Sequence, residues 1–365
     1  MDKIAIVIPA YEPDERLISL IEDLTQKEIG PIYIVNDGST AEFDVVFDAI
    51  KDKVEKSGGL VLNHEINKGK GRALKTAFEY ILNNEPNVQV VVTADSDGQH
   101  TGDCILRVMN ASRENKNSLV LGIRTFEDKE IPWKSSFGNK LTEKVFKYVT
   151  GVHITDTQTG LRAIPRDYLP ELLNIKGERF EFEMRMLIDA VEKLEIVEVP
   201  IKTIYESKEN HQTHFDPIKD SIRIYRILGE RFIKFIFSSV SSCLLDLILF
   251  GVLCHFLKAK DPILYVTYAT VIARIFSAMY NYGINYGLVF KSEENVGKAA
   301  AKYCLLAVIQ MSCSALLVTG LVNFFPNGIE VIFKAIVDTM LFFVSYSIQQ
   351  KLVFKKISQK QRTLA

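Results

Sequence analysis

The second half of this 365-residue chain contains four long apolar stretches with little polar sequence between them. They span Phe232–Phe256, Ile263–Phe290, Tyr303–Phe325 and Ile329–Phe354. Each is long enough for the roughly 20 residues that cross a hydrocarbon core. Buried helices of a large soluble domain seldom follow one another in this way. The sequence therefore predicts an all-α membrane domain of four transmembrane helices.

Charge divides the chain at the same place. From Arg231 onward there are 14 Lys and Arg against 6 Asp and Glu, whereas the first 230 residues hold 30 against 39. Such asymmetry indicates that the two halves meet different environments. The N-terminus leads into a strand without a signal peptide, so we expect the first half to stay in the cytoplasm. Four spans would return the C-terminus to that side. Lysines near 291 and 355 agree with this orientation, and Lys258 and Lys260 count mildly against it.

The first half alternates between strand and helix patterns. Ile4–Ile8 is a continuous apolar run, followed by helical periodicity, a strand at Ile32–Val35, a further unit over Leu60–Leu82 and a strand at Val88–Thr93. A continuous apolar run is typical of a strand that is covered on both faces. Alternation of this kind predicts an α/β, Rossmann-like domain with a mostly parallel sheet and a site outside the carboxyl ends of its strands.

Two carboxylates end the fourth expected strand. Asp95 and Asp97 are one residue apart, so they point the same way into the crevice at the edge of the sheet. Because like charges repel, the pair needs a cation, and hard oxygen ligands suit Mg²⁺ or Mn²⁺. Taken alone, the pattern is better explained by an ordinary polar turn.

Three more loops reach the same edge. They are Pro9–Pro13, Asn36–Thr40 and Asn67–Arg72, and they bring carboxylates, glycines and cations together. Any one of them is ordinary turn chemistry. Their convergence is typical of a pocket for a nucleotide diphosphate.

The ordered motifs resemble glycosyltransferase family 2 with a GT-A fold. They read Pro-Ala-Tyr-Glu-Pro, Asn-Asp-Gly-Ser-Thr, Asn-Lys-Gly-Lys-Gly and Asp-Ser-Asp-Gly-Gln-His, and they continue through Gly122–Arg124, Asp156–Arg162, Arg179–Glu183 and Thr213–Phe215. Within the family the chain is most similar to the polyprenyl-phosphate glycosyltransferases, which include dolichyl-phosphate mannose synthase and bactoprenol glucosyltransferases. The second half resembles the GtrA-like four-span family through Arg231–Phe235, Asp246, Asn281 with Asn285, Ser345–Tyr346 and Val353–Lys355.

This resemblance implies a set of site residues. Those expected to bind the nucleotide sugar are Pro9, Tyr11, Glu12, Asp37, Lys70 and Asp95; those expected to hold the metal are Asp95, Asp97 and Gln99. Catalytic roles fall to Asp97, Arg124, Lys134, Arg162 and His214, mainly as charges that stabilise the two phosphate groups. Lys134 stands where the family often has Arg, and Lys lacks the forked contact to phosphate. Glu183 either orients Arg162, acts on the substrate or lies on an exposed helix face.

The resemblance and the composition together imply four segments. A cytoplasmic GT-A domain covers 1–214, an amphipathic juxtamembrane helix 215–231, a GtrA-like membrane domain 232–356 and a cytoplasmic tail 357–365. Ionised groups inside membrane spans usually pair with one another. We therefore expect Arg274 to pair with Asp246 or Asp338 in the membrane domain.

The expected function is that of a membrane-bound inverting glycosyltransferase. It would move a hexose, with UDP-glucose as the first choice of donor, to undecaprenyl phosphate or a related polyprenyl phosphate. UDP-N-acetylglucosamine and GDP-mannose are alternative donors. A different class of function is translocation of a lipid-linked sugar by the membrane domain beside a non-catalytic transferase domain. The expected partners are the nucleotide sugar, the lipid and the membrane, with no nucleic acid; a homo-oligomer stays open.

Overall fold

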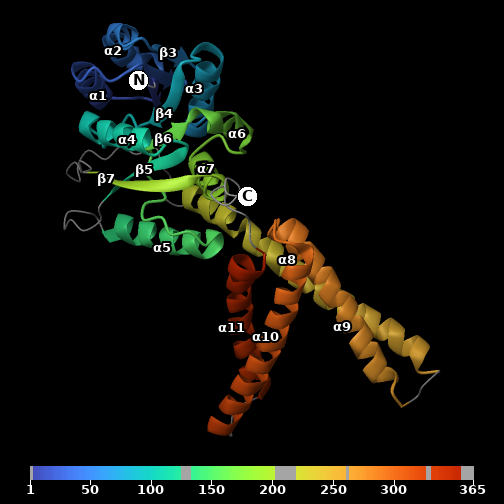
Figure 1. The fold of residues 1–365 in the computed structure, drawn as a ribbon. Coiled ribbons are helices and arrows are strands. Elements are labelled where there is room, and N and C mark those ends of the chain that lie inside the picture. The colour runs from blue at the N-terminus through green and yellow to red at the C-terminus, as the bar shows by residue number, and fades with distance from the viewer. Residues whose placement is uncertain (1–2, 125–132, 202–218, 260–262, 326–329, 355–365) are drawn as a thin grey trace. The chain divides into compact units, whose positions relative to one another are not determined.

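The computed structural model describes residues 3–124, 133–201, 219–259, 263–325 and 330–354. The chain divides into two compact units, Met1–Ile227 and Leu228–Ala365. In Figure 1 the first unit carries the sheet and the second consists of long helices.

A seven-stranded sheet forms the centre of the first unit. Its strands are β1 (Lys3–Ala10), β2 (Ile32–Asn36), β3 (Leu60–Asn63), β4 (Val88–Thr93), β5 (Ser118–Arg124), β6 (Arg162–Pro165) and β7 (Glu195–Ile201), in the order β3-β2-β1-β4-β6-β5-β7. All neighbouring pairs are parallel except those of β6, which runs antiparallel to β4 and β5. The predicted mixed α/β architecture and mostly parallel sheet are confirmed.

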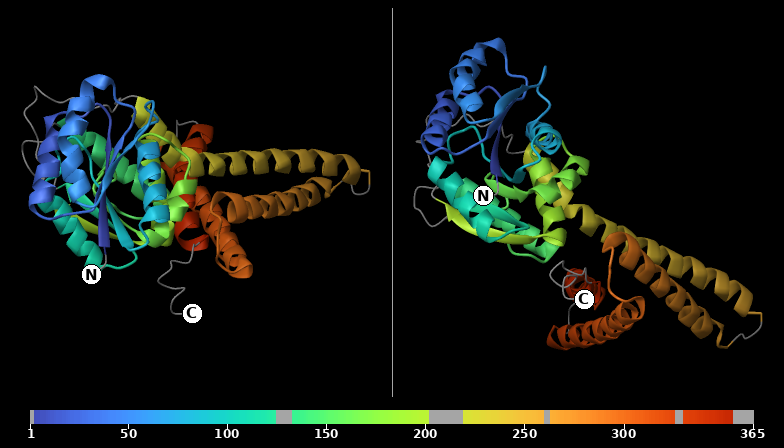
Figure 2. Two further views of the ribbon diagram at one scale, coloured as in Figure 1. Left: turned by 90° about the horizontal axis from the view of Figure 1, so that it is seen from above. Right: turned by 45° about the horizontal axis from the view of Figure 1, so that its top comes forward.

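Helices cover both faces of this sheet. The helices α1 (Glu15–Gln26), α2 (Asp44–Lys56) and α4 (Gly102–Glu114) share one core with the isoleucines of β1. On the other face lie α3 (Lys70–Asn84), α6 (Leu169–Asn174) and α7 (Glu181–Lys193), as Figures 1 and 2 show. The unit also contains α5 (Trp133–Thr150) and the short 3-10 turns η1 (Ala41–Phe43) and η2 (Arg166–Tyr168). Burial on both faces explains why β1 reads as a continuous apolar run.

Long helices make up the second unit. They are α8 (Lys219–Leu257), which begins in the first unit, α9 (Tyr265–Ile284), α10 (Val296–Phe324) and α11 (Glu330–Ile348). The helices α9 and α11 each continue into one π-helical turn, η3 (Asn285–Val289) and η4 (Gln349–Val353). Because α8 runs without a break, the expected surface helix at 215–231 and the expected first span belong to one helix over their described residues.

The outer surface of the second unit is apolar. Phe237 and Leu316, for example, are 70% and 74% exposed. Within the described ranges, two segments are long and apolar enough to cross a membrane, Tyr225–Leu257 and Val296–Leu321. Exposed apolar side chains in such numbers are unusual in a soluble protein and ordinary for helices that face lipid. The count of four spans stays a prediction.

Candidate functional site

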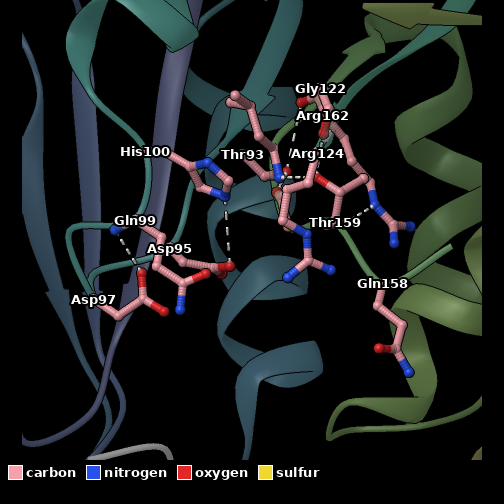
Figure 3. A network of polar contacts seen from close by, with 12 residues as sticks. Thr93, Asp95, Asp97, Gln99, His100, Gly122, Arg124, Gln158, Thr159 and Arg162 are labelled. Carbon is pink, nitrogen blue, oxygen red and sulfur yellow. Dashed lines mark hydrogen bonds and ion pairs between the residues drawn. The ribbon is translucent and has the colours of Figure 1, made fainter. Parts of the chain in front are cut away.

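Asp95 and Asp97 follow β4 and lie at the carboxyl edge of the sheet, as predicted. Figure 3 shows both side chains beside Gln99 and His100. The Asp97 carboxylate accepts a hydrogen bond from the backbone N–H of Gln99 over 3.1 Å. Burial, together with the negative charge of Asp95, raises the pKa of Asp97 above its usual range. The two carboxylates therefore destabilise each other, which is the condition under which a cation binds well.

Lys70 at the start of α3 neutralises part of this charge. Its Nζ lies 2.6 Å from Asp95 Oδ1 and 2.8 Å from Glu183 Oε2. Burial opposes the charged form of Lys70, but the two carboxylates outweigh it and raise the pKa of the ammonium. Burial likewise raises the pKa of Asp95, but Lys70 and His100 outweigh it and lower that pKa overall.

Glu183 is a site residue that the sequence left undecided. Its side chain is only 10% exposed, so the reading as an exposed helix face is wrong. Oε2 contacts Lys70, while Oε1 is buried and has no hydrogen-bond partner among the residues that the structure describes. The signal in the sequence was the Phe-Glu-Phe-Glu motif at the start of α7, in which Glu183 directly follows Phe182, a fully buried core residue.

The Asp37 carboxylate anchors the loop that leads into α3. It is 2% exposed, and it accepts hydrogen bonds from the backbone N–H groups of Lys68 over 3.0 Å and Gly69 over 2.7 Å. His64 Nδ1 lies 2.7 Å from Asp37 Oδ1. These bonds fix the start of α3 and hence the base of the Lys70 side chain. Contact of Asp37 with a nucleoside stays a prediction.

The end of β1 and the loop after it bring three predicted residues to the same edge. Pro9 lies in β1 and is buried, while Tyr11 and Glu12 follow the strand and are half-buried. The Glu12 N–H donates to Ser39 Oγ over 2.8 Å, which ties this loop to the loop after β2. Glu12 has a φ of +48°, a conformation that side-chain-bearing residues seldom adopt outside special turns. A hydrogen bond to Glu12 raises the pKa of the Tyr11 phenol.

Arg124 ends β5 and is held by a buried carboxylate. Its Nε and Nη2 atoms donate to Asp156 Oδ2 over 2.7 Å and to Asp156 Oδ1 over 3.0 Å. Asp156 is fully buried at 0% exposure and also accepts from the Gln158 N–H. Such a forked pair fixes the plane of a guanidinium. The sequence pointed to Arg124 but not to Asp156, although both lie in quoted motifs.

Arg162 is buried below the surface of the site, where a substrate would not reach its side chain. It is 1% exposed, and its guanidinium donates to the carbonyl oxygens of Thr159 and Glu183 over 2.9 and 2.8 Å. Burial lowers the pKa of this guanidinium. The structure therefore gives Arg162 a positioning contact with the segment before β6 and with α7. It does not test the predicted catalytic role.

Two predicted catalytic residues fall outside this description. His214 lies outside the described residues, and Lys134 lies in the first turn of α5 with its side chain outside them. Their assignments stay predictions.

The donor set suits a hard divalent ion. Asp95, Asp97 and Gln99 offer carboxylate and amide oxygens, which Mg²⁺ and Mn²⁺ prefer, and a site that carries a diphosphate needs few protein ligands. No cluster of three or more His, Cys, Asp or Glu arranged to hold an ion occurs in the described ranges. The mutual repulsion of the two aspartates nevertheless fits a cation between or beside them.

Family models match both halves of the chain. One described as glycosyl transferase family 2 matches residues 5–173, and one described as the GtrA/DPMS transmembrane domain matches residues 234–354. The second match agrees with the apolar surface of the helical unit. The chain therefore carries a membrane domain.

Curated relatives match over roughly half of this chain. An uncharacterised protein of Methanocaldococcus jannaschii is 28% identical over 209 residues, which is 56% of this chain and 82% of that protein. The UDP-N-acetylglucosamine–dolichyl-phosphate N-acetylglucosaminyltransferase of Methanococcus voltae is 30% identical over 217 residues, 55% of this chain and 86% of that enzyme. Among solved structures, a mannosyltransferase from Pyrobaculum calidifontis in complex with GDP-Man and Mn²⁺ aligns with 14% identity and a TM-score of 0.39, covering 96% of this chain and 87% of that one.

Proposed function

Because this chain is a glycosyltransferase that belongs to glycosyl transferase family 2, we propose that it transfers a hexose from a nucleotide diphosphate sugar to a polyprenyl phosphate. The observation that carries the proposal is the convergence of Asp95, Asp97, Lys70 and Arg124 at one sheet edge in a chain that also has a membrane domain. The relative from M. voltae is named for a reaction of this class.

The donor would bind at the edge that carries Asp95. In this proposal Asp95, Asp97 and Gln99 hold Mg²⁺ or Mn²⁺, which supplies positive charge against the donor diphosphate when it is bound. Pro9, Tyr11, Glu12 and Asp37 surround the nucleoside, and Lys70 contacts the diphosphate. UDP-glucose is the first donor to test, and UDP-N-acetylglucosamine and GDP-mannose are the next.

The acceptor needs no general base. A phosphate monoester with a second pKa near 6 is already an anionic nucleophile at pH 7. One of its oxygens attacks the anomeric carbon, the bond from that carbon to the donor diphosphate breaks, and the nucleoside diphosphate leaves with inversion. The protein must hold two repelling groups in line, which is the work of fixed cations such as Arg124. An α-donor that gives an α-product would contradict this route.

The membrane domain would bring the lipid acceptor to the transferase. We place the transferase unit and the C-terminus on the cytoplasmic side, with several spans in the cell membrane. Lipid translocation is the competing role for this domain, and it is separable by experiment. A variant of Arg274 that keeps transfer and abolishes movement of the lipid product would favour translocation.

The test is transfer itself. Purified protein in lipid vesicles is given each nucleotide sugar with a polyprenyl phosphate, with Mn²⁺, Mg²⁺ or a chelator. A lipid-linked sugar formed from one donor and lost with the chelator supports the proposal. Transfer to a soluble hydroxyl acceptor instead would contradict it.

A further inference from the structure

Lys70 contacts two carboxylates, those of Asp95 and Glu183. The exposed fractions of the Lys70, Asp95 and Glu183 side chains are 17%, 26% and 10%, so water screens the three groups only in part. The Lys70 ammonium also lies 5.9 Å from the centre of the Phe180 ring. Lys70 therefore contacts two of three neighbouring carboxylates, which, with Asp97 as the third, carry up to three negative charges.

The same segment that provides Glu183 is bound to the start of α3 at further points. Arg72 and Lys75 both pair with Glu178, and the Arg72 N–H donates to the Glu178 carbonyl over 2.9 Å. A Cβ added at Gly71 would lie 2.6 Å from Cβ of Phe182. The start of α3 and the start of α7 thus form one packed junction, which fixes the distance between Lys70 and Glu183.

We propose that Lys70 is a resident cation of the acidic site and that Glu183 is the positioning residue that holds it there. This rests on the proposed function. Asp95 Oδ1 contacts Lys70, so a divalent ion that binds Asp95 competes with the ammonium. Lys70 then turns to the donor diphosphate while Glu183 keeps it within reach, because the Glu183 contact does not involve Asp95.

Binding of Mn²⁺ alone tests this without any transfer. Free Mn²⁺ is measured by electron paramagnetic resonance during titration of the full-length protein. We expect Lys70→Met to tighten Mn²⁺ binding by about tenfold, since a positive charge beside the ion is removed. Lys68→Met is the matched control in the same loop, where the side chain is exposed, and should leave Mn²⁺ binding unchanged. Unchanged or weaker binding in Lys70→Met would overturn the proposal.

Glu183→Gln tests the positioning role. The variant should raise the KM for the nucleotide sugar several-fold and leave kcat within about twofold, because Lys70 loses its anchor but the reacting groups stay. Equal loss in kcat, or no change in either constant, would contradict the role. If no donor supports transfer at all, the Mn²⁺ titration still decides the inference, so its failure is distinct from that of the proposed function.

The membrane domain carries a second, independent inference, which begins with a repeated sequence. Leu-Val-Phe-Lys occurs at Leu288–Lys291 and again at Leu352–Lys355. The first copy follows α9 and the second follows α11, and a π-helical turn lies at the end of each helix. When the two copies of Leu-Val-Phe-Lys are aligned, Asn285 corresponds to Gln349 and Tyr282 corresponds to Tyr346. Isolated π-helical turns are rare, so their occurrence at matching positions is informative.

Aromatic contacts repeat in the same register. Phe235 of α8 meets Tyr346 with ring centroids 5.1 Å apart and a 60° interplanar angle. In the other half, Lys302-Tyr303 of α10 corresponds to Lys234-Phe235, and Tyr303 meets Tyr282 at 5.6 Å and 60°. Phe290 with Tyr346 and Phe354 with Tyr282 also match, at 5.7 and 5.8 Å and 40° in both cases.

Residues that correspond to each other also touch each other. Phe290 stacks on Phe354 at 5.2 Å and 17°, and Asn285 Nδ2 donates to Gln349 Oε1 over 3.2 Å. Across a twofold axis, residue i of one copy contacts residue j of the other, and residue j of the first copy contacts residue i of the second. A residue on the axis meets its own equivalent. The axis passes between Asn285, which is 0% exposed, and Gln349, which is 5% exposed.

The geometry points to a duplicated helical hairpin: α8 with α9 and η3 is one copy, α10 with α11 and η4 the other. The joint between the copies consists of the stacked phenylalanines and the amide pair on the axis. Each copy also has its own polar contact at matching positions. Arg274 Nη2 lies 3.3 Å from Asp246 Oδ2, which confirms one of the two predicted pairings, and Ser314 Oγ donates to Asp338 Oδ1 over 2.6 Å.

Matched substitutions in the two copies test the duplication. Phe290→Ala and Phe354→Ala should lower the thermal midpoint in detergent by the same amount within error. The double variant should lower it by less than the sum, because both remove one shared contact. Leu288→Ala and Leu352→Ala are the controls at corresponding exposed positions, 67% and 56%, and should change little.

An exchange of the axial amides gives a sharper result. Asn285→Ala should lower the thermal midpoint. The reciprocal variant, Asn285→Gln with Gln349→Asn, keeps an amide pair on the axis, so its thermal midpoint should stay close to that of the wild-type protein. Strongly unequal effects of the two phenylalanine variants, or a reciprocal exchange as damaging as Asn285→Ala, would overturn the twofold joint.

Discussion

Gly160 leaves Asp95 no room for a larger neighbour. A Cβ added there would lie 2.3 Å from Asp95 Oδ2, and Thr93 Oγ1 donates to the Gly160 carbonyl over 2.7 Å, which keeps the backbone in place. The orientation of Asp95 thus depends on a glycine from a distant segment of the chain. The sequence marked Gly160 only as part of a family motif.

We expect Gly160→Ala to reduce transfer at least about tenfold while the protein still folds, since Asp95 must turn away to relieve the clash. Initial rates at saturating donor measure the effect. Gly229→Ala is the control, because its added Cβ comes no nearer than 3.7 Å to Ile233. Full activity in Gly160→Ala would show that Asp95 tolerates another orientation.

Asp97→Asn should have opposite effects on catalysis and on the metal-free fold. Transfer should fall by about 100-fold or more, as expected when a metal ligand that stabilises the leaving group is lost. Without metal the thermal midpoint should stay the same or rise, because the repulsion between Asp97 and Asp95 is removed.

The discriminating readout is stabilisation by Mn²⁺. Wild-type protein should gain thermal stability with Mn²⁺ over chelator, as any ligand of the folded state confers. Asp97→Asn should lose most of that gain. An identical gain in both proteins would place the ion elsewhere.

At the scale of elements, the loop before α3 depends on Asp37. We expect Asp37→Asn to lower the free energy of unfolding by about 1–3 kcal/mol, because buried N–H donors of Lys68 and Gly69 lose a charged acceptor. The shift of the thermal midpoint measures it. Asp48→Asn, on the exposed face of α2, is the control. A variant of normal stability with impaired donor binding would instead favour direct contact with the nucleoside.

Local patterns predicted most of the first unit. The apolar runs at Ile4–Ile8 and Val88–Thr93 are strands, and the carboxylates that follow the second run lie at the expected edge. The antiparallel β6 between β4 and β5 was not predicted, because Arg162–Pro165 is short and its place depends on pairing with Thr93. Asp156 was missed and Glu183 stayed undecided for a similar reason, since only the tertiary fold buries them.

At the scale of the whole molecule, the amount of apolar sequence predicted a membrane domain but not its internal order. The duplication is nearly invisible in composition, because only Leu-Val-Phe-Lys and a few aromatic positions repeat. Contacts between α9, α10 and α11 reveal it. The predicted orientation follows from the N-terminal sequence, the expected number of spans and the lysine placement, and it needs its own test.

Cysteine labelling tests that orientation. In a variant with all five cysteines replaced, Lys258→Cys and Ser292→Cys are treated with a membrane-impermeant maleimide in sealed right-side-out vesicles. Four spans with a cytoplasmic transferase predict labelling at 258 from outside and at 292 only after permeabilisation. The reverse pattern would invert the topology. Labelling of both positions from outside would show that the chain does not cross the membrane twice between a cytoplasmic transferase and position 292.

The proposed reaction is measured as transfer of a radiolabelled sugar to a polyprenyl phosphate in vesicles. The panel of nucleotide sugars is tried with Mn²⁺ or chelator, and Asp97→Asn is run in parallel. We expect one lipid-linked product that requires a divalent ion and disappears in Asp97→Asn. A product that forms equally well with chelator, or equally well in Asp97→Asn, would contradict it.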